Sequence, residues 1–282
     1  MKNRLLAWRI ALVTLITLAA IAAALLIPPM PQPLAYHDFA DAREAAGIPN
    51  FLNVTSNVGF LVVGIAGLFI ALGRRACFQF TIERRPYTFF FVGVALTAAG
   101  STYYHLNPDN ETLFWDRLPM TIAFMALVSS QIVDRIDIRA GIRLLIPMLV
   151  LGVVSVMYWR ATERANAGNV IPYAVLQAYS MVILLLMAAF APSRYTRGTD
   201  LYWVFIWYAL SKALETYDSE VFSSLGYSVS GHTLKHIAAA FAGGAVCVML
   251  ARRTLIDQNA HSLAPSPGVR AAHAGDSHAK RR

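Results

Sequence analysis

The fold is decided by long uncharged runs, of which the clearest is Val170–Ala191, with the sequence VIPYAVLQAYSMVILLLMAAFA. A helix that crosses the hydrocarbon core of a bilayer needs about 20 predominantly apolar residues. The strands of a membrane β-barrel would instead alternate apolar and polar residues in segments of about ten. Because this run is continuous, it predicts a membrane-spanning helix.

Seven further runs of the same kind predict an all-α, polytopic membrane bundle with eight spanning helices. These runs are Trp8–Ile27, Leu52–Leu72, Tyr87–His105, Leu118–Val133, Leu144–Trp159, Leu201–Tyr217 and His232–Ala251. The composition agrees, since 57% of the 282 residues are hydrophobic and 14% are charged. Soluble domains are about 45–50% apolar and about 25% charged. A soluble enzyme, a disordered chain and a disulfide-rich secreted module are therefore excluded.

The chain is expected to divide into three parts. Residues 1–35 contain the first span and the start of an outer loop, residues 36–251 form a membrane domain with the other seven spans, and residues 252–282 form a disordered, basic cytoplasmic tail. The first span also resembles a secretory signal peptide, because basic residues precede its apolar stretch. Its apolar region exceeds the usual length of about 7–15 residues, so we favour a retained anchor.

The net charge of +8 is explained by topology. With the amino terminus in the cytoplasm, 18 of the 24 Lys and Arg residues fall on the cytoplasmic side. The six others are Arg43, Arg117, Arg160, Arg164, Lys212 and Lys235. Cytoplasmic loops carry such an excess of basic residues, so both termini are expected to be cytoplasmic and no nucleic-acid partner is expected.

Three of the seven histidines lie at the ends of predicted spans: His105 ends the third span, and His232 and His236 begin the eighth. His232 and His236 are four residues apart, which places both on one helix face. The predicted topology brings all three to the outer leaflet. Ionisable groups within spans are unfavourable and indicate function. Three imidazoles leave one position of a tetrahedral zinc ion open, as in catalytic sites.

Two more polar residues are expected near these histidines. Ser101 precedes His105 by one helical turn, and Asp116 opens the fourth span on the same side. Zinc lowers the pKa of a bound water to about 7. A nearby carboxylate could accept a proton from that water, and a hydroxyl could donate to a developing oxyanion.

The motifs, taken in order, resemble those of the alkaline ceramidase family. They are Ser101-Thr-Tyr-Tyr-His105, Trp115-Asp116-Arg-Leu-Pro-Met120 and His232-Thr-Leu-Lys-His236, preceded by a loop similar to the family's amino-terminal signature. The family belongs to a superfamily of seven-helix membrane hydrolases that includes the adiponectin receptors. The similarity runs from Tyr36 to Ala251 and leaves the first span as an addition.

This resemblance implies a zinc-dependent amidase that splits ceramide, or a related long-chain lipid amide, into a fatty acid and an amine base. In such a site His105, His232 and His236 would bind Zn²⁺, Asp116 would act as general base and Ser101 would stabilise the oxyanion. The expected partners are a lipid substrate and membrane lipids. The oligomeric state is not predicted.

The family also has a Ca²⁺ site in its amino-terminal loop, and this chain matches it in part. Asp38 and Asp41 match two acidic positions, and Phe39 stands where an aromatic residue offers its carbonyl. Asn50 replaces a Glu, and Arg43 replaces an Asn ligand. Fewer anionic ligands and a nearby cation weaken the binding of a hard dication. An Arg43–carboxylate pair is the alternative support for this loop.

Two other functions remain open. The first is a zinc-stabilised receptor or scaffold, in which the metal joins the third and eighth spans. The second, a proton-coupled transporter, is less favoured because the inner half of the bundle has few polar residues. Lys212 and Glu215, three residues apart, are expected to neutralise each other, and Lys235 is expected to contact a loop carboxylate or a lipid headgroup.

Overall fold

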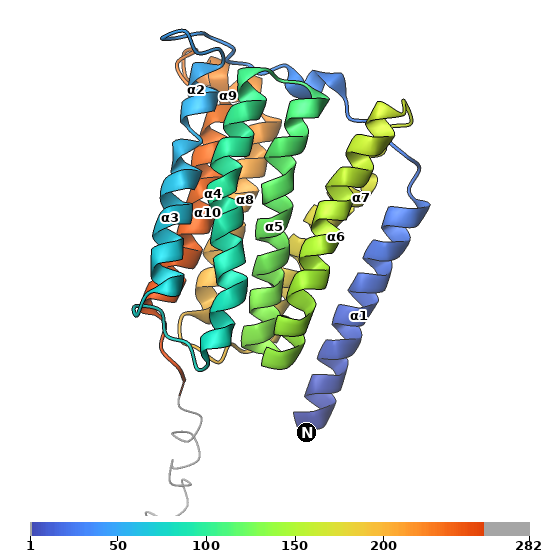
Figure 1. Cartoon of the computed structure of the whole chain (residues 1–282), viewed down its shortest axis with the longest axis vertical. Helices are drawn as coiled ribbons and strands as arrows, with labels where there is room; N and C mark the ends of the chain where they lie inside the picture. Colours follow the sequence, from blue (N-terminus) through green and yellow to red (C-terminus); the bar gives the residue numbers. More distant parts are fainter. Residues whose placement is uncertain (1, 257–282) are drawn as a thin grey trace, which may run out of the picture.

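The computed structural model describes residues 2–256, with the side chains of residue 8 and of residues 10–256. The chain forms helices α1 (Lys2–Leu26), α2 (Phe51–Thr55), α3 (Val58–Leu72), α4 (Arg84–Leu106), α5 (Asn110–Arg135), α6 (Ile138–Arg164), α7 (Ile171–Phe190), α8 (Leu201–Thr216), α9 (Asp218–Ser224) and α10 (Gly231–Arg252). Short 3-10 turns occur at η1 (Leu34–His37), η2 (Thr81–Glu83) and η3 (Gly198–Asp200). The described residues form no strand (Figure 1), which confirms the all-α bundle.

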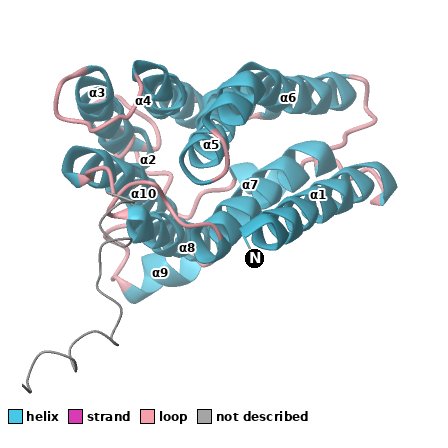
Figure 2. Ribbon diagram, turned by 90° about the horizontal axis from the view of Figure 1, so that it is seen from below, coloured by secondary structure: helices cyan, strands magenta, loops and turns pink. Residues whose placement is uncertain are grey.

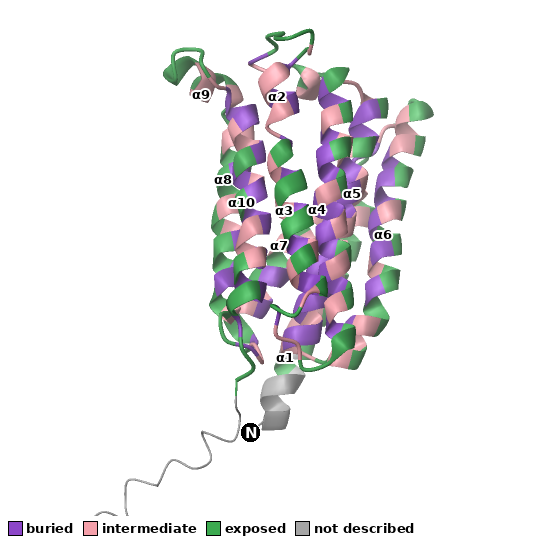
Figure 3. Cartoon of the chain, turned by 60° about the vertical axis from the view of Figure 1, so that its left-hand side comes forward, coloured by how far each residue is buried: buried purple, intermediate pink, exposed green. Residues whose placement is uncertain are grey.

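Four stretches are long and apolar enough to cross a membrane by length and composition alone. They are Phe51–Leu72, Ile138–Arg164, Ile171–Phe190 and Gly231–Arg252. The helices α4, α5 and α8 run beside them in the same bundle, and the large exposed side chains of the bundle include Phe69, Trp203 and Ile206. Exposed residues follow the outer faces of the helices along their length (Figure 3). The protein is therefore membrane-embedded.

The helices pack mostly against antiparallel neighbours. α4 lies between α3 and α5, α10 lies against both α3 and α8, and α5 also contacts α6 and α7. The extra amino-terminal helix α1 packs on α7 at the margin of the bundle (Figure 2). That contact includes a hydrogen bond of 3.0 Å between the hydroxyls of Thr17 and Tyr179.

Several helix ends differ from the predicted ones. α5 begins at Asn110, eight residues before the predicted start, because the Asp109 side chain accepts a hydrogen bond from the backbone N–H of Thr112. The predicted span Leu52–Leu72 is divided into α2 and α3 at Ser56 and Asn57. The short helix α9 lies in what the sequence predicts as a loop.

The chain still contacts the bundle just past residue 251, where the sequence predicts the end of the membrane domain. Residues 252–256 are ordered: the Thr254 carbonyl accepts from the backbone N–H of Thr196, and the Ile256 N–H donates to the Arg194 carbonyl. Arg253 is buried against the rings of Phe78, Tyr87 and Tyr195. The rest of the predicted tail lies outside the described residues.

Candidate metal centre

The three histidines predicted as metal ligands meet at one point. His105 lies in the last turn of α4, and His232 and His236 lie in the first two turns of α10. The Nε2 atom of His105 is 3.2 Å from that of His236 and 3.4 Å from that of His232. All three side chains are buried, with residue exposures of 1%, 4% and 4%.

This arrangement fits a tetrahedral cation. Ligand nitrogens at about 2.0–2.1 Å from such an ion lie about 3.3–3.4 Å from one another, which matches the two observed separations. A neutral imidazole carries one N–H, so the Nε2 of His105 cannot donate to both neighbours. Among the described residues, this is the group of histidine, cysteine and acidic side chains whose ligand atoms all lie within 4.8 Å. A metal ion could therefore be held here.

The loop before α2 covers the histidines. The ring of Phe39 lies 4.7 Å from the His105 ring and 4.4 Å from the His232 ring, measured between centroids. On another side, the Ser56 Oγ is 2.8 Å from the Nδ1 of His236. A hydrogen bond to the second ring nitrogen orients a metal-ligating imidazole. Phe39 and Ser56 thus limit both solvent access and ring rotation.

Polar side chains also fasten this loop to the helices that carry the histidines. Asp218 accepts hydrogen bonds from the backbone N–H groups of Ala40, at 2.9 Å, and His232, at 2.7 Å. Asn50 donates its side-chain amide to the His105 carbonyl at 2.9 Å. Asn53 accepts from the Thr233 hydroxyl and donates to the Asp41 carbonyl. The loop, α4 and α10 are therefore held in one arrangement.

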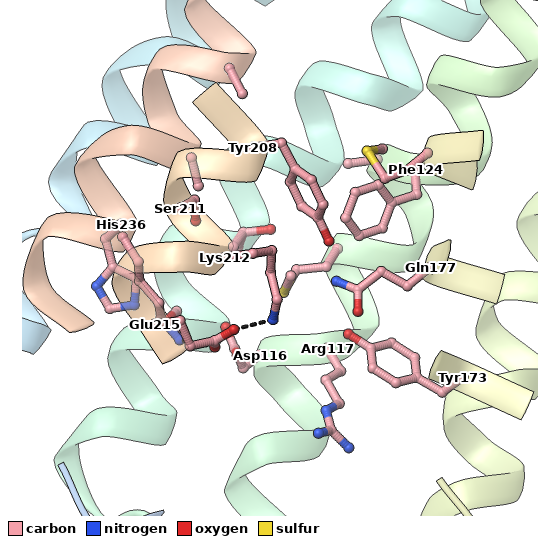
Figure 4. Close-up of a pocket in the computed structure, with 18 of the residues that line it drawn as sticks. Asp116, Arg117, Phe124, Tyr173, Gln177, Tyr208, Ser211, Lys212, Glu215 and His236 are labelled. Carbon is pink, nitrogen blue, oxygen red and sulfur yellow. Dashed lines mark hydrogen bonds and ion pairs between the residues drawn. The ribbon is translucent and has the colours of Figure 1, made fainter. Parts of the chain in front are cut away.

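Ser101 and Asp116 line a single cavity with His236. Figure 4 shows Asp116 and His236 in this cavity. The cavity has a volume of about 350 Å³. Its deeper walls are largely apolar and include Phe90, Val94, Phe124, Leu127 and Met181. The site thus combines imidazoles, a carboxylate and a hydroxyl with space for an alkyl chain.

Sequence reasoning missed the acidic partner of Lys235. Glu215 on α8 receives Lys235 at 2.6 Å, pairs with Lys212, and accepts a hydrogen bond from the Tyr36 hydroxyl at 3.0 Å. The Lys212–Glu215 pair is confirmed, and Figure 4 shows it at the cavity. Lys235 contacts Glu215 because α8 and α10 lie side by side, which a single sequence does not reveal.

The residues predicted for Ca²⁺ are engaged within the protein. Arg43 donates from Nε and Nη2 to the two carboxylate oxygens of Asp41, each at 2.7 Å. These hydrogen bonds hold the pKa of Asp41 below its usual value. Asn50 is bonded to His105, and the Phe39 ring rests on the histidines. The Arg43–carboxylate pair is therefore present, and the Ca²⁺ site at Asp38, Phe39, Asp41 and Asn50 stays a prediction.

Comparison of the chain with protein-family models, with curated proteins and with solved structures found no match. The resemblance to alkaline ceramidases therefore stays a prediction carried by the motifs.

Proposed function

We propose that the protein is a zinc-dependent amide hydrolase of the membrane that cleaves ceramide or a related long-chain lipid amide. The observation that carries this proposal is the convergence of three histidine Nε2 atoms beside a cavity that Asp116 and Ser101 also line. The alkaline ceramidase resemblance supports the same chemistry. His236 and Asp116 both lie at this cavity (Figure 4).

The shape and lining of the cavity support a lipid substrate. Its apolar walls suit an acyl chain, while Asp116, Ser101 and His236 line the same cavity. A lipid amide whose acyl chain lies along Phe90 and Phe124 would have its amide group close to Ser101 and Asp116.

Each polar residue has a role in the proposed reaction. A bound zinc ion would polarise the amide carbonyl and supply water of lowered pKa. Asp116 accepts a proton from the attacking water and can pass it to the leaving amine. The Ser101 hydroxyl donates a hydrogen bond to the oxyanion that develops on the carbonyl oxygen. Phe39 covers the histidine rings and restricts their access to bulk water.

The proposed orientation follows the positive-inside rule, with both termini in the cytoplasm and the histidines near the outer leaflet. The substrate would then enter from the outer half of the bilayer. The described basic residues Arg74, Arg85, Arg139, Arg194 and Arg252 belong to the end of the bundle opposite α2 and α9 (Figure 1), which supports this assignment.

The test measures both the metal content and the hydrolytic activity of the wild-type protein and its variants. Protein purified in detergent should contain about one zinc per chain by elemental analysis and release fatty acid from N-palmitoylsphingosine. We expect His232→Ala to lose both the metal and the activity. Asp116→Asn should keep the metal and lose at least about a hundredfold in rate, the contribution typical of a general base. His37→Gln, which changes a histidine outside the triad, is the matched control and should keep both.

Two results would contradict the proposal. A wild-type protein without zinc would remove the metal from the mechanism. Full activity in Asp116→Asn would deny the role given to that carboxylate. Metal retained without hydrolysis of any lipid amide would favour a zinc-stabilised receptor or scaffold instead.

A further inference from the structure

Arg117 is a buried cation that has no carboxylate partner among the described residues. It is 6% exposed, and the ion pairs of the described chain involve other basic residues. Its Nη2 donates to the Gln32 side-chain oxygen at 2.6 Å, and its guanidinium lies over the rings of Trp159 and Tyr173 at 4.3 and 4.7 Å. A charge within a membrane protein that is not paired is unfavourable and indicates a binding role.

One donor of this guanidinium is also unused. The Nη1 of Arg117 is buried and has no hydrogen-bond partner among the residues that the structure describes. Buried polar groups are rarely left without a partner, and charged ones least of all. The residue lines the same cavity as Asp116 and Ser101.

The side chains that line the cavity carry one more positive charge than negative charges, and Arg117 is the cation without a counter-charge. They comprise three cations and two carboxylates: Arg117, Lys212 and Lys235, with Asp116 and Glu215. Lys212 and Lys235 both contact Glu215. Asp116 supplies the second negative charge of the cavity wall. These four groups therefore balance, and Arg117 is the cation without a counter-charge.

Arg117 is well placed to contact a molecule whose amide lies near the histidines. It follows Asp116 directly on α5, and successive helical residues point about 100° apart. Asp116 lines the cavity with Ser101 and Lys235. The Arg117 guanidinium lies over the rings of Trp159 on α6 and Tyr173 on α7. Figure 4 shows Arg117 beside Tyr173 in the cavity wall. Asp116 and Arg117 can therefore contact adjacent parts of one bound molecule.

We propose that Arg117 binds an acidic group, a carboxylate or a phosphate, on the amine portion of the lipid amide. The favoured substrates are then acidic lipid amides, such as N-acyl amino acids, over neutral ceramides of the same chain length. This rests on the proposed function for the amide bond itself. A guanidinium presents paired donors to a carboxylate or a phosphate. Gln32, a neutral acceptor on the segment before η1, occupies part of that donor set and leaves Nη1 for the acid.

The test measures binding with ligands that contain no amide. Full-length protein in lipid nanodiscs is titrated by calorimetry with hexadecyloxyacetate, 2-hexadecyloxyethyl phosphate and the neutral 2-hexadecyloxyethanol. We expect at least one acid to bind about tenfold more tightly than the alcohol, as hydrogen bonds to charged groups allow. The stronger of the two acids identifies the headgroup as carboxylate or phosphate.

Variants assign this preference to Arg117. Arg117→Gln should bind acid and alcohol equally. Gln32→Glu keeps the arginine but supplies a carboxylate from within the protein, so it should remove the preference even if Arg117→Gln fails to fold. Arg160→Gln is the matched control, because Arg160 pairs with Glu111 away from the cavity and its variant should keep the full preference.

Equal binding of both acids and the alcohol by wild type would overturn the proposal. An acid preference that persists in Arg117→Gln or in Gln32→Glu would also overturn it, since the metal or the lysines would then account for binding. Because these ligands cannot be hydrolysed as amides, the result is independent of the fatty-acid release that tests the proposed function.

Discussion

At the residue scale, the Asp41–Arg43 pair should make stability depend on pH. The pKa of Asp41 in the folded protein is lowered by Arg43, so the carboxylate contributes stability above the unfolded value of about 3.9. That contribution is lost as the pH falls through the lowered pKa. We expect Arg43→Gln to reduce the melting temperature at pH 7. The difference from wild type should narrow as the pH falls below about 3.9 and approaches the lowered pKa of Asp41.

The control for the Asp41–Arg43 pair is Arg43→Gln in a protein that lacks the Asp41 carboxylate. In an Asp41→Asn background, Arg43→Gln should shift the melting temperature equally at every pH between 3 and 7. A difference between wild type and Arg43→Gln that does not vary with pH would show that Arg43 acts through its contact with the Ser228 carbonyl and not through Asp41.

Single residues were predictable where the sequence itself set their depth in the membrane. His105, His232 and His236 end or begin spans, so one assignment of topology brings them to one level, and they do converge. Glu215 and Arg117 were not recognised as cavity residues. Their partners Lys235, Tyr36 and Tyr173 belong to other helices, and no local spacing indicates which helices are neighbours.

At the element scale, two glycines allow a close approach of α4, which carries Ser101, and α5, which carries Asp116. A Cβ on Gly100 would lie 2.0 Å from the Trp115 carbonyl oxygen, and one on Gly93 would lie 2.7 Å from the Ala123 nitrogen. Small residues permit such close backbone contact between membrane helices. We expect Gly100→Ala to lower stability by about 1–3 kcal/mol, as overpacking does. It should also reduce hydrolysis, because α4 must move away from Asp116.

The matched control is Gly244→Ala on α10, where an added Cβ meets nothing within 4 Å. Alanine favours helix by up to about 1 kcal/mol over glycine, so this variant should be as stable as wild type or more stable. Unfolding in denaturant, followed by helical circular dichroism, compares the two variants. Equal stability of Gly100→Ala and Gly244→Ala would refute the steric account of the α4–α5 contact.

The sequence predicts the helices only over the parts of them that are apolar. Each of the eight predicted runs forms helix, but α5 and α6 extend beyond theirs because Asp109 and Asp137 cap polar first turns. Hydropathy responds to apolar composition and misses such turns. The helix α9 was not predicted for the same reason, because it is short and has acidic residues in its first turn.

At the scale of the whole molecule, the most basic loops and the candidate metal centre occupy opposite ends of the bundle. The loops that follow α3 and α7 carry Arg74, Arg75, Arg194 and Arg197, whereas the histidines lie beneath α2 and α9. The charge pattern predicts this separation because it follows the alternation of helix direction. It does not predict the cavity, which depends on which faces of α4, α5, α7, α8 and α10 meet.

This separation predicts the orientation of the chain in the cell. Ser224 on α9 and Thr199 on η3 are both exposed, and each can carry a single cysteine in a Cys77→Ser, Cys247→Ala background. Basic loops stay in the cytoplasm, so a membrane-impermeant maleimide added to intact cells should label Ser224→Cys and spare Thr199→Cys. After the cells are lysed, both variants should be labelled to the same extent. This result would show that the two cysteines are equally reactive. Labelling of Thr199→Cys alone in intact cells would place the histidines at the cytoplasmic face, and lipid amides would then have to enter from the inner leaflet.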